Sequence, residues 1–217
     1  MTGYSLVNIL GGLLIVTSML VVLAKTPRRG AYLYAVQSLV IVALFVVLGT
    51  TTGSGELFKW SVTALITKVI IAPGIILFAL KKPGDGGVSL EPKLSAVKII
   101  VVIAIEVFLC FVVVQGVELP TAADVKPALA ISLAHFFVGL TCIVTQRNIV
   151  KQIFGYCLME NGSSVTLALL APQAPELVEV GVSTDAFFAV LIMAVMVVRI
   201  YKHAHTLDAD DLMELKG

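Results

Sequence analysis

Charged residues are scarce in this sequence. They make up 13% of its 217 residues, while 59% are hydrophobic and the mean hydropathy is +1.03. A soluble domain carries about 25% charged residues, because it needs them to cover its water-facing surface. The composition therefore predicts an integral membrane protein, and the length suits one compact bundle within a lipid bilayer.

Motifs for cofactors, metals and catalysis are also missing. Cys110, Cys142 and Cys157 stand singly in apolar segments, and the sequence has no Cys-x-x-Cys pair or Cys/His cluster. His203 and His205 follow the last hydrophobic run and are expected to be solvated interfacial residues. No phosphate-binding loop, nucleophile triad or dinucleotide fingerprint is present. We therefore expect no cofactor, no metal, no nucleic-acid partner and no active site within this chain.

Seven hydrophobic runs are long enough to cross a bilayer as helices, which takes about 20 residues each. The first run lacks a basic leading region and a small-residue cleavage site, so it is expected to stay as a span. The predicted fold is an all-α integral membrane protein with seven transmembrane helices. The runs cover residues 4–24, 31–50, 57–80, 95–115, 126–145, 148–171 and 177–201.

Lysine and arginine gather at one set of helix ends. Cytoplasmic loops of membrane proteins carry an excess of these residues. With seven crossings, this bias predicts an N-terminus outside and a C-terminus in the cytoplasm. The basic ends hold Lys25, Arg28, Arg29, Lys81, Lys82, Lys93, Lys98, Arg147, Lys151, Arg199, Lys202 and Lys216. The opposite ends hold Lys59 and Lys126 with Glu56, Glu118, Asp124, Glu176 and Glu179.

A glycine-rich loop, Lys-Lys-Pro-Gly-Asp-Gly-Gly, follows the third predicted helix and is the expected internal boundary. We expect an N-terminal three-helix unit at 1–82, a linker and fourth helix at 83–124, and a second three-helix unit with a cytoplasmic tail at 125–217. Aligning Gln37 with Glu160 indicates a weak three-helix duplication, a common device of membrane transport proteins.

Four ionisable residues, Lys68, His135, Glu160 and Asp185, lie deep inside the predicted spans. Each is about 12–18 Å from a helix end at 1.5 Å per residue, which places all of them near the bilayer midplane. A charge at that depth costs about 2.5–3.5 kcal/mol and favours a functional role. Such a layer predicts a lateral proton or ion path. Glu106 lies at the same depth, but its helix has few other polar groups.

Glu160 has the most polar surroundings of the four. Tyr156, Asn161, Ser163 and Ser164 lie within one helical turn of it and could order water beside the carboxylate. The alternative is a helix-to-helix hydrogen-bond anchor.

The other three residues also have structural alternatives. Asp185 could neutralise a buried cation, with Lys68 or His135 as its partner, and Lys68 could equally be a plain ion-pair partner. His135 stands beside Phe136 and Phe137 and could be a hydrogen-bonded core residue.

The stretch from Arg147 to Asn161 reads R-N-x-x-x-x-x-x-G-Y-C-L-M-E-N and resembles the K subunit of respiratory complex I. That small three-helix protein links antiporter-like subunits through two buried glutamates, and residues 125–217 cover its whole length. Over the full chain, Q-R-N-I-V-K-Q-I-F-G-Y-C-L-M-E-N-G-S, S-T-D-A-F-F-A-V, I-T-K-V-I-I-A-P and S-L-A-H-F resemble the hydrogenase-4 component E family of formate hydrogenlyase complexes.

The resemblance places the first family glutamate at Cys157, with Glu160 one turn further along the helix, and the second at Asp185. It implies a membrane subunit of a complex-I-like group 4 [NiFe] hydrogenase in the bacterial inner membrane. Glu160, Asp185, Lys68 and His135 would carry protons or sodium between antiporter-like partners in a hetero-oligomer. Two rivals remain: a scaffold whose charges only lock helices together, and a self-contained ion transporter.

Overall fold

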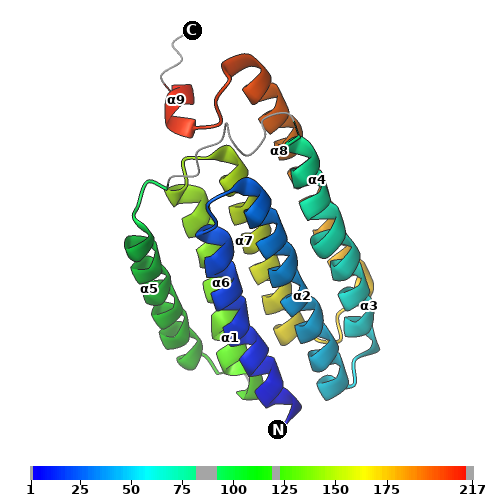
Figure 1. Ribbon diagram of the computed structural model, residues 1–217. Helices are drawn as coiled ribbons and strands as arrows, with labels where there is room; N and C mark the ends of the chain where they lie inside the picture. Colours follow the sequence, from blue (N-terminus) through cyan, green and yellow to red (C-terminus); the bar gives the residue numbers. More distant parts are fainter. Residues whose placement is uncertain (1, 82–91, 119–122, 214–217) are drawn as a thin grey trace.

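The computed structural model describes residues 2–81, 92–118 and 123–213 and forms a bundle of long helices that lie nearly side by side (Figure 1). Within these ranges there is no β-strand beyond isolated bridges. The helices are α1 (Gly3–Val22), α2 (Pro27–Thr52), α3 (Gly55–Ala64), the π-helix η1 (Leu65–Ile71), α4 (Ala72–Ala79), α5 (Ala96–Gln115), the short 3₁₀ turn η2 (Ala123–Val125), α6 (Lys126–Thr145), α7 (Ile149–Leu170), α8 (Glu176–Ala204) and α9 (Ala209–Met213).

Each predicted hydrophobic run forms a long helix. The third run is covered by α3, η1 and α4, which follow one another without a break. Within the described residues, six helices are long and apolar enough to cross a membrane. The seventh, α7, has 22 residues and is not among these six. The all-α membrane fold is therefore confirmed, while the seventh crossing stays a prediction. The predicted boundary at the glycine-rich loop falls mostly on residues 82–91, outside the described residues.

Helix ends follow local sequence signals. The side chains of Thr2, Thr26, Ser54 and Asn148 each accept a hydrogen bond from a backbone N–H of the first turn that follows. Gly53 ends α2 with a φ of 69°, the left-handed conformation that glycine adopts without steric cost. The turns between α1 and α2, α2 and α3, and α6 and α7 are short, so the helices that they join run in opposite directions (Figure 1).

Helices α6 and α7 pack more closely than any other pair in the described residues. Glycines make this possible: a Cβ atom at Gly139 would lie 2.4 Å from the backbone nitrogen of Met159, and one at Gly162 would lie 2.5 Å from that of Phe136. Small residues let helices approach in this way in a membrane, where the hydrophobic effect does not drive helices together.

Replacing Gly139 by alanine is therefore expected to lower the free energy of unfolding by about 1–3 kcal/mol, since the added methyl group must push α7 away. Gly12→Ala is the matched control, because its new Cβ would have nothing within 4 Å. Thermal melting of both purified variants in detergent measures the difference. Equal melting temperatures would show that the α6–α7 contact can open without loss.

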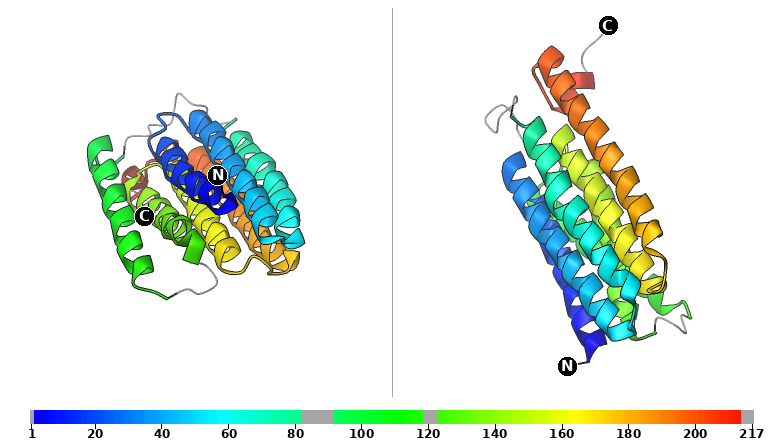
Figure 2. Two further views of the ribbon diagram at one scale, coloured as in Figure 1. Left: turned by 90° about the horizontal axis from the view of Figure 1, so that it is seen from below. Right: turned by 90° about the vertical axis from the view of Figure 1, so that its right-hand side faces the viewer.

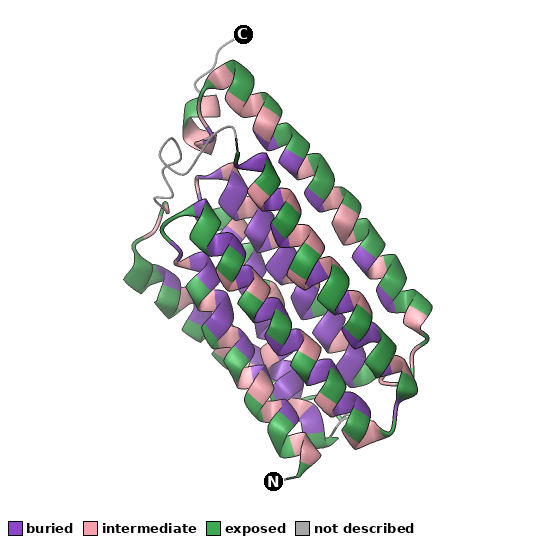
Figure 3. Ribbon diagram, turned by 45° about the vertical axis from the view of Figure 1, so that its right-hand side comes forward, coloured by how far each residue is buried: buried purple, intermediate pink, exposed green. Residues whose placement is uncertain are grey.

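The first three long helices pair with the last three across the bundle. Helix α1 packs on α6, α2 on α7, and α4 on α8, so α7 lies inside while α5 packs along α6 at one side (Figure 2). Residues facing these contacts are buried and those facing outward are mostly exposed (Figure 3). These contacts do not test the duplication, which stays a prediction.

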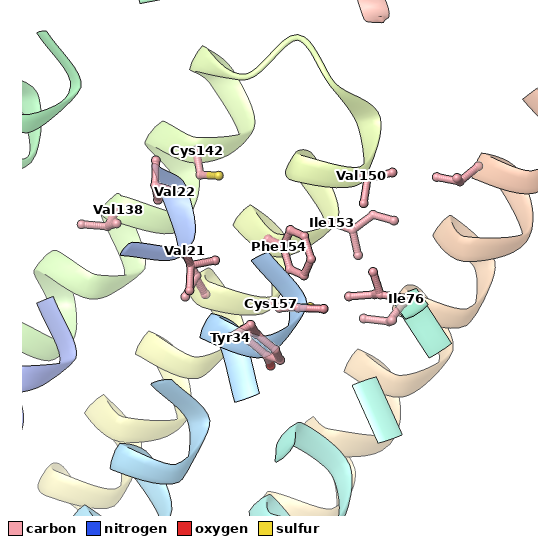
Figure 4. Close-up of a cluster of buried hydrophobic side chains, with 14 of the residues drawn as sticks. Val21, Val22, Tyr34, Ile76, Val138, Cys142, Val150, Ile153, Phe154 and Cys157 are labelled. Carbon is pink, nitrogen blue, oxygen red and sulfur yellow. The ribbon is translucent and has the colours of Figure 1, made fainter. Parts of the chain in front are cut away.

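The apolar core is continuous with the region around Glu160. Tyr34 from α2, Ile76 from α4 and Phe154 and Cys157 from α7 lie together in one buried cluster (Figure 4). At the opposite end from the start of α1, α8 extends past the other helices and α9 folds back (Figure 1). Arg147 forms an ion pair with this tail, since its Nε lies 3.1 Å from Asp208 Oδ1.

Candidate functional site

Lys68 lies at the centre of the π-helix η1. In this segment the N–H of Ala72 donates to the carbonyl of Thr67, five residues earlier. Pro73 follows at once and has no N–H to continue the α-helical pattern. The chain continues through Pro73 into α4, and the wider π turn changes the direction in which Lys68 leaves its helix; such turns are frequent at functional sites. The Lys68 side chain is consequently buried inside the bundle.

Lys68 forms two buried ion pairs. Its Nζ lies 2.9 Å from Glu160 Oε1 and 3.2 Å from Glu179 Oε1. The side chains are 4%, 9% and 0% exposed, respectively, so water screens these charges only weakly. We call Lys68, Glu160 and Glu179 the ion-pair cluster. It joins η1, α7 and α8.

Two hydroxyl groups extend the cluster. Ser164 Oγ accepts a hydrogen bond from Lys68 Nζ at 2.7 Å and donates to Glu160 Oε1 at 3.1 Å. Ser183 Oγ donates to Glu179 Oε1 at 3.1 Å. Each carboxylate thus has one hydroxyl partner besides the shared ammonium group, which gives the three charges a connected hydrogen-bond network.

A cavity of about 20 Å³ touches the cluster at Lys68, Glu160 and Ser183. That volume holds about one water molecule. A groove of about 220 Å³ between α3–η1 and α8 shares Thr67 and Ser183 with the cavity. Thr63 and Thr184 add two more hydroxyl groups to its wall. The cluster is therefore adjacent to a partly polar groove on the side of the bundle.

His135 belongs to a separate buried network. Its Nδ1 lies 2.6 Å from Ser18 Oγ, and its Nε2 lies 3.2 Å from Gln37 Nε2. Because the Ser18 hydroxyl donates to the carbonyl of Leu14, it accepts from Nδ1–H, and Nε2 then accepts from Gln37. Gln37 Oε1 accepts in turn from Asn161 at 2.8 Å. This network ties α1, α2, α6 and α7 together through a neutral imidazole and two amides.

The remaining predicted residues lie apart from the cluster. Asp185 is exposed on α8, and Ser163 is exposed on α7 and donates to the carbonyl of Met159. Tyr156 is only partly buried, at the edge of the apolar core. The structure thus brings Lys68, Glu160 and Ser164 together and leaves His135 and Asp185 elsewhere.

Glu179 was missed by the sequence reasoning, which placed it with the charges of an outer helix end. It lies in the first turn of α8, where the helix dipole favours a carboxylate, yet it is fully buried against Lys68. One signal was available: Ser183 follows four residues later, on the same helix face.

Two other ionisable groups point inward. Lys151, predicted as a surface charge of a basic end, is 1% exposed and donates to the carbonyls of Val21 and Val22, which end α1. A cation suits a helix C-terminus, where free carbonyls carry partial negative charge.

Glu106 accepts a hydrogen bond from Thr141, and its other carboxylate oxygen is buried with no partner in the described residues. Within these residues no group of three His, Cys, Asp or Glu side chains could hold a metal ion.

Several known proteins are similar to this chain over part or all of its length. Residues 127–217 match the family NADH-ubiquinone/plastoquinone oxidoreductase chain 4L. The chain is 46% identical over all 217 residues to hydrogenase-4 component E of Escherichia coli (strain K12) and of Shigella flexneri, with 100% of each protein covered. An uncharacterized protein of Mycobacterium tuberculosis is 24% identical over 211 residues, which cover 97% of this chain and 96% of that protein. No solved structure matches the chain. The resemblance seen in the sequence is confirmed, and the chain belongs to the hydrogenase-4 component E family.

Proposed function

We propose that this chain is a seven-helix membrane-arm subunit of a complex-I-like group 4 [NiFe] hydrogenase of the formate hydrogenlyase type. It lies in the bacterial inner membrane, with its N-terminus outside and its C-terminus in the cytoplasm. Helix α7 supplies the seventh crossing, because its polar residues Lys151, Glu160 and Asn161 bond to other helices of the bundle. The start of α1 and the tail at α9 lie at opposite ends of the bundle, as an odd number of crossings requires (Figure 1).

The ion-pair cluster forms part of a lateral path for protons or sodium ions. The observation that carries this proposal is the position of the Lys68 ammonium group between carboxylates of two other helices, 2.9 and 3.2 Å away. When one carboxylate is neutralised by a cation, its attraction for Lys68 falls and the ammonium group moves toward the other. Redox chemistry in a partner soluble arm drives the cycle by shifting this balance.

Asp185 marks the face of α8 on which a partner subunit packs. It is a carboxylate on the exposed side of an apolar helix. Such a group in contact with lipid is costly, so a donor or cation from an antiporter-like subunit is expected to cover it. The hydroxyl-lined groove at Thr67 and Ser183 connects this face with the cluster. His135 supports the path from a distance by holding four helices in register.

Replacing Glu160 by glutamine is expected to leave the complex assembled and its hydrogenase reaction active, while ion translocation per turnover falls to near background. Glutamine keeps the size and the hydrogen bond to Ser164 but removes the charge that attracts Lys68. Ion uptake by inverted vesicles, divided by hydrogen production, measures this ratio. Glu176→Gln, at the partly exposed start of α8, is the control. If an assembled Glu160→Gln complex translocates as many ions per turnover as the wild type, the proposal is wrong.

A scaffold function is the second candidate. The His135 network and the Lys151 contact with the end of α1 both tie helices together without an ion pair. A pure scaffold predicts that Glu160→Gln lowers the amount of assembled complex but leaves translocation per turnover unchanged in the complex that does assemble. The two functions are separated by the amount of assembled complex in the membrane, measured beside translocation.

A further inference from the structure

The charges of the ion-pair cluster do not balance. In the described residues, one ammonium group, that of Lys68, pairs with two carboxylates, those of Glu160 and Glu179. If all three were ionised, the site would hold an uncompensated negative charge among side chains that are 9% exposed or less. Such a charge is strongly disfavoured in a buried site. The cluster therefore has a place for one more positive charge.

An unpartnered atom indicates where that charge belongs. Glu179 Oε1 has both Ser183 and Lys68 as partners, whereas Glu179 Oε2 is buried and has no hydrogen-bond partner in the described residues. Glu160 Oε1 is likewise engaged by Lys68 and Ser164. Tyr34 and Cys157 also face the adjoining cavity, and neither carries a positive charge. The free oxygen of Glu179 is thus the most poorly stabilised acceptor of the cluster.

The surroundings fit a proton better than a sodium ion. A metal cation needs several oxygen ligands around it, as the six to eight of calcium sites illustrate. The cavity at the cluster has room for about one water molecule, and the Lys68 ammonium group forms part of its wall, where it repels a second cation. Most of the remaining wall is apolar: Ile71, Ala72, Ile75, Ala186, Phe187 and Val190. A proton needs no coordination sphere and binds directly to a carboxylate oxygen.

We infer that the ion-pair cluster holds one exchangeable proton, shared between the carboxyl groups of Glu160 and Glu179, and that sodium is not its substrate. The inference rests on the proposed function and names the ion that the same site carries. The step is a proton transfer only: the O–H bond forms on a carboxylate as a hydronium ion at the adjoining cavity becomes water, and it breaks when the proton returns to water. Lys68 stays charged and pairs with whichever carboxylate is ionised.

Infrared spectroscopy of the purified full-length chain in detergent tests the shared proton. A protonated carboxyl group has a C=O stretching band that a carboxylate lacks. Because Glu106 and Asp185 can contribute bands of their own, the band is measured as the difference between wild type and variant. We expect the difference spectra of Glu179→Gln and of Glu160→Gln each to show the loss of one carboxyl band, because in each variant the remaining cluster carboxyl group ionises and pairs with Lys68. Glu176→Gln, on the same helix as Glu179, is expected to keep the band. Difference spectra in which neither cluster variant loses a carboxyl band overturn the inference.

Thermal melting supplies a second readout. Each single glutamine variant mimics one protonated carboxyl group and should melt within a few degrees of the wild type. The double variant leaves Lys68 without a carboxylate and should melt about 10 °C lower or more. If a single variant melts as low as the double variant, neither carboxyl group of the cluster is protonated in the wild type, which contradicts the inference.

A sodium titration needs only the wild-type protein, so it decides the ion even where a variant does not accumulate. A ligand bound by the native state raises the melting temperature as its concentration rises. Exchanging choline chloride for sodium chloride at constant ionic strength should leave the melting temperature unchanged. A sodium-dependent rise that Glu179→Gln removes overturns the proposal. None of these measurements involves turnover, so failure of coupling and failure of the shared proton are recognised separately.

Discussion

Replacing Lys68 by methionine is expected to lower the free energy of unfolding by about 3–5 kcal/mol, the usual effect of removing one partner of a buried ion pair. Methionine fills similar space, so the loss comes from electrostatics. Glu160 and Glu179 would face each other across the cluster without a cation, and each would keep only its serine hydroxyl partner. The same change removes the group that the proposed path moves, so coupling is expected to be lost as well.

Melting temperature in detergent and the amount of assembled complex measure this effect. Lys59→Met is the matched control, because Lys59 pairs with Glu56 at 2.9 Å but the side chains are 54% and 31% exposed. Water screens an exposed pair of this kind, so its loss is expected to change the melting temperature little. The triple variant Lys68→Met, Glu160→Gln, Glu179→Gln has no net charge in the cluster and should regain most of the stability while remaining uncoupled. If Lys68→Met and Lys59→Met melt alike, the three charges do not form a buried cluster.

Replacing His135 by phenylalanine is expected to destabilise the bundle but to leave ion translocation per turnover intact. Phenylalanine fills the space of the imidazole, yet it leaves the Gln37 amide donor and the Ser18 hydroxyl without their buried partner. Each buried polar group left unsatisfied costs about 1–3 kcal/mol. The network carries no carboxylate, and its amide links do not ionise, so the proposed proton path does not need it.

This variant separates the two interpretations of His135 that the sequence left open. His203→Phe, at the exposed end of α8, is the control for the substitution itself. Melting temperature should fall for the first variant only, and translocation per turnover in the assembled complex should be equal in both. Loss of translocation in an assembled, active His135→Phe complex would place His135 in the path after all.

Much of the architecture could be predicted because lipid leaves few choices. A run of about 20 apolar residues can satisfy its backbone only as a helix, so seven runs predicted seven long helices. The same argument marked Lys68 and Glu160 as deep charges that need a partner. The family was recognised from short motifs around Arg147 and Asn161, and the full-length identity of 46% confirms it.

Depth along a helix predicts how costly a charge is but not which side of the helix it occupies. Asp185 and Glu160 were both assigned to the interior by depth, yet Asp185 faces outward on α8. Glu179 and Lys151 were assigned to helix ends by position, yet both are buried. A helix end can be covered by a neighbour that is longer or shifted, and a linear sequence carries no record of that shift.

Composition, run length and hydropathy are enough to predict the class of this protein, the positions of its helices and the presence of costly charges. The partners of those charges depend instead on how the helices pack against one another. The π turn at Lys68, the glycine contact of α6 with α7 and the packing of α8 on α4 together set which residues meet. Glu160 is 92 positions from Lys68 in the chain, and Glu179 is 111 positions from it. Only the folded bundle brings both carboxylates within 3.2 Å of the Lys68 ammonium group.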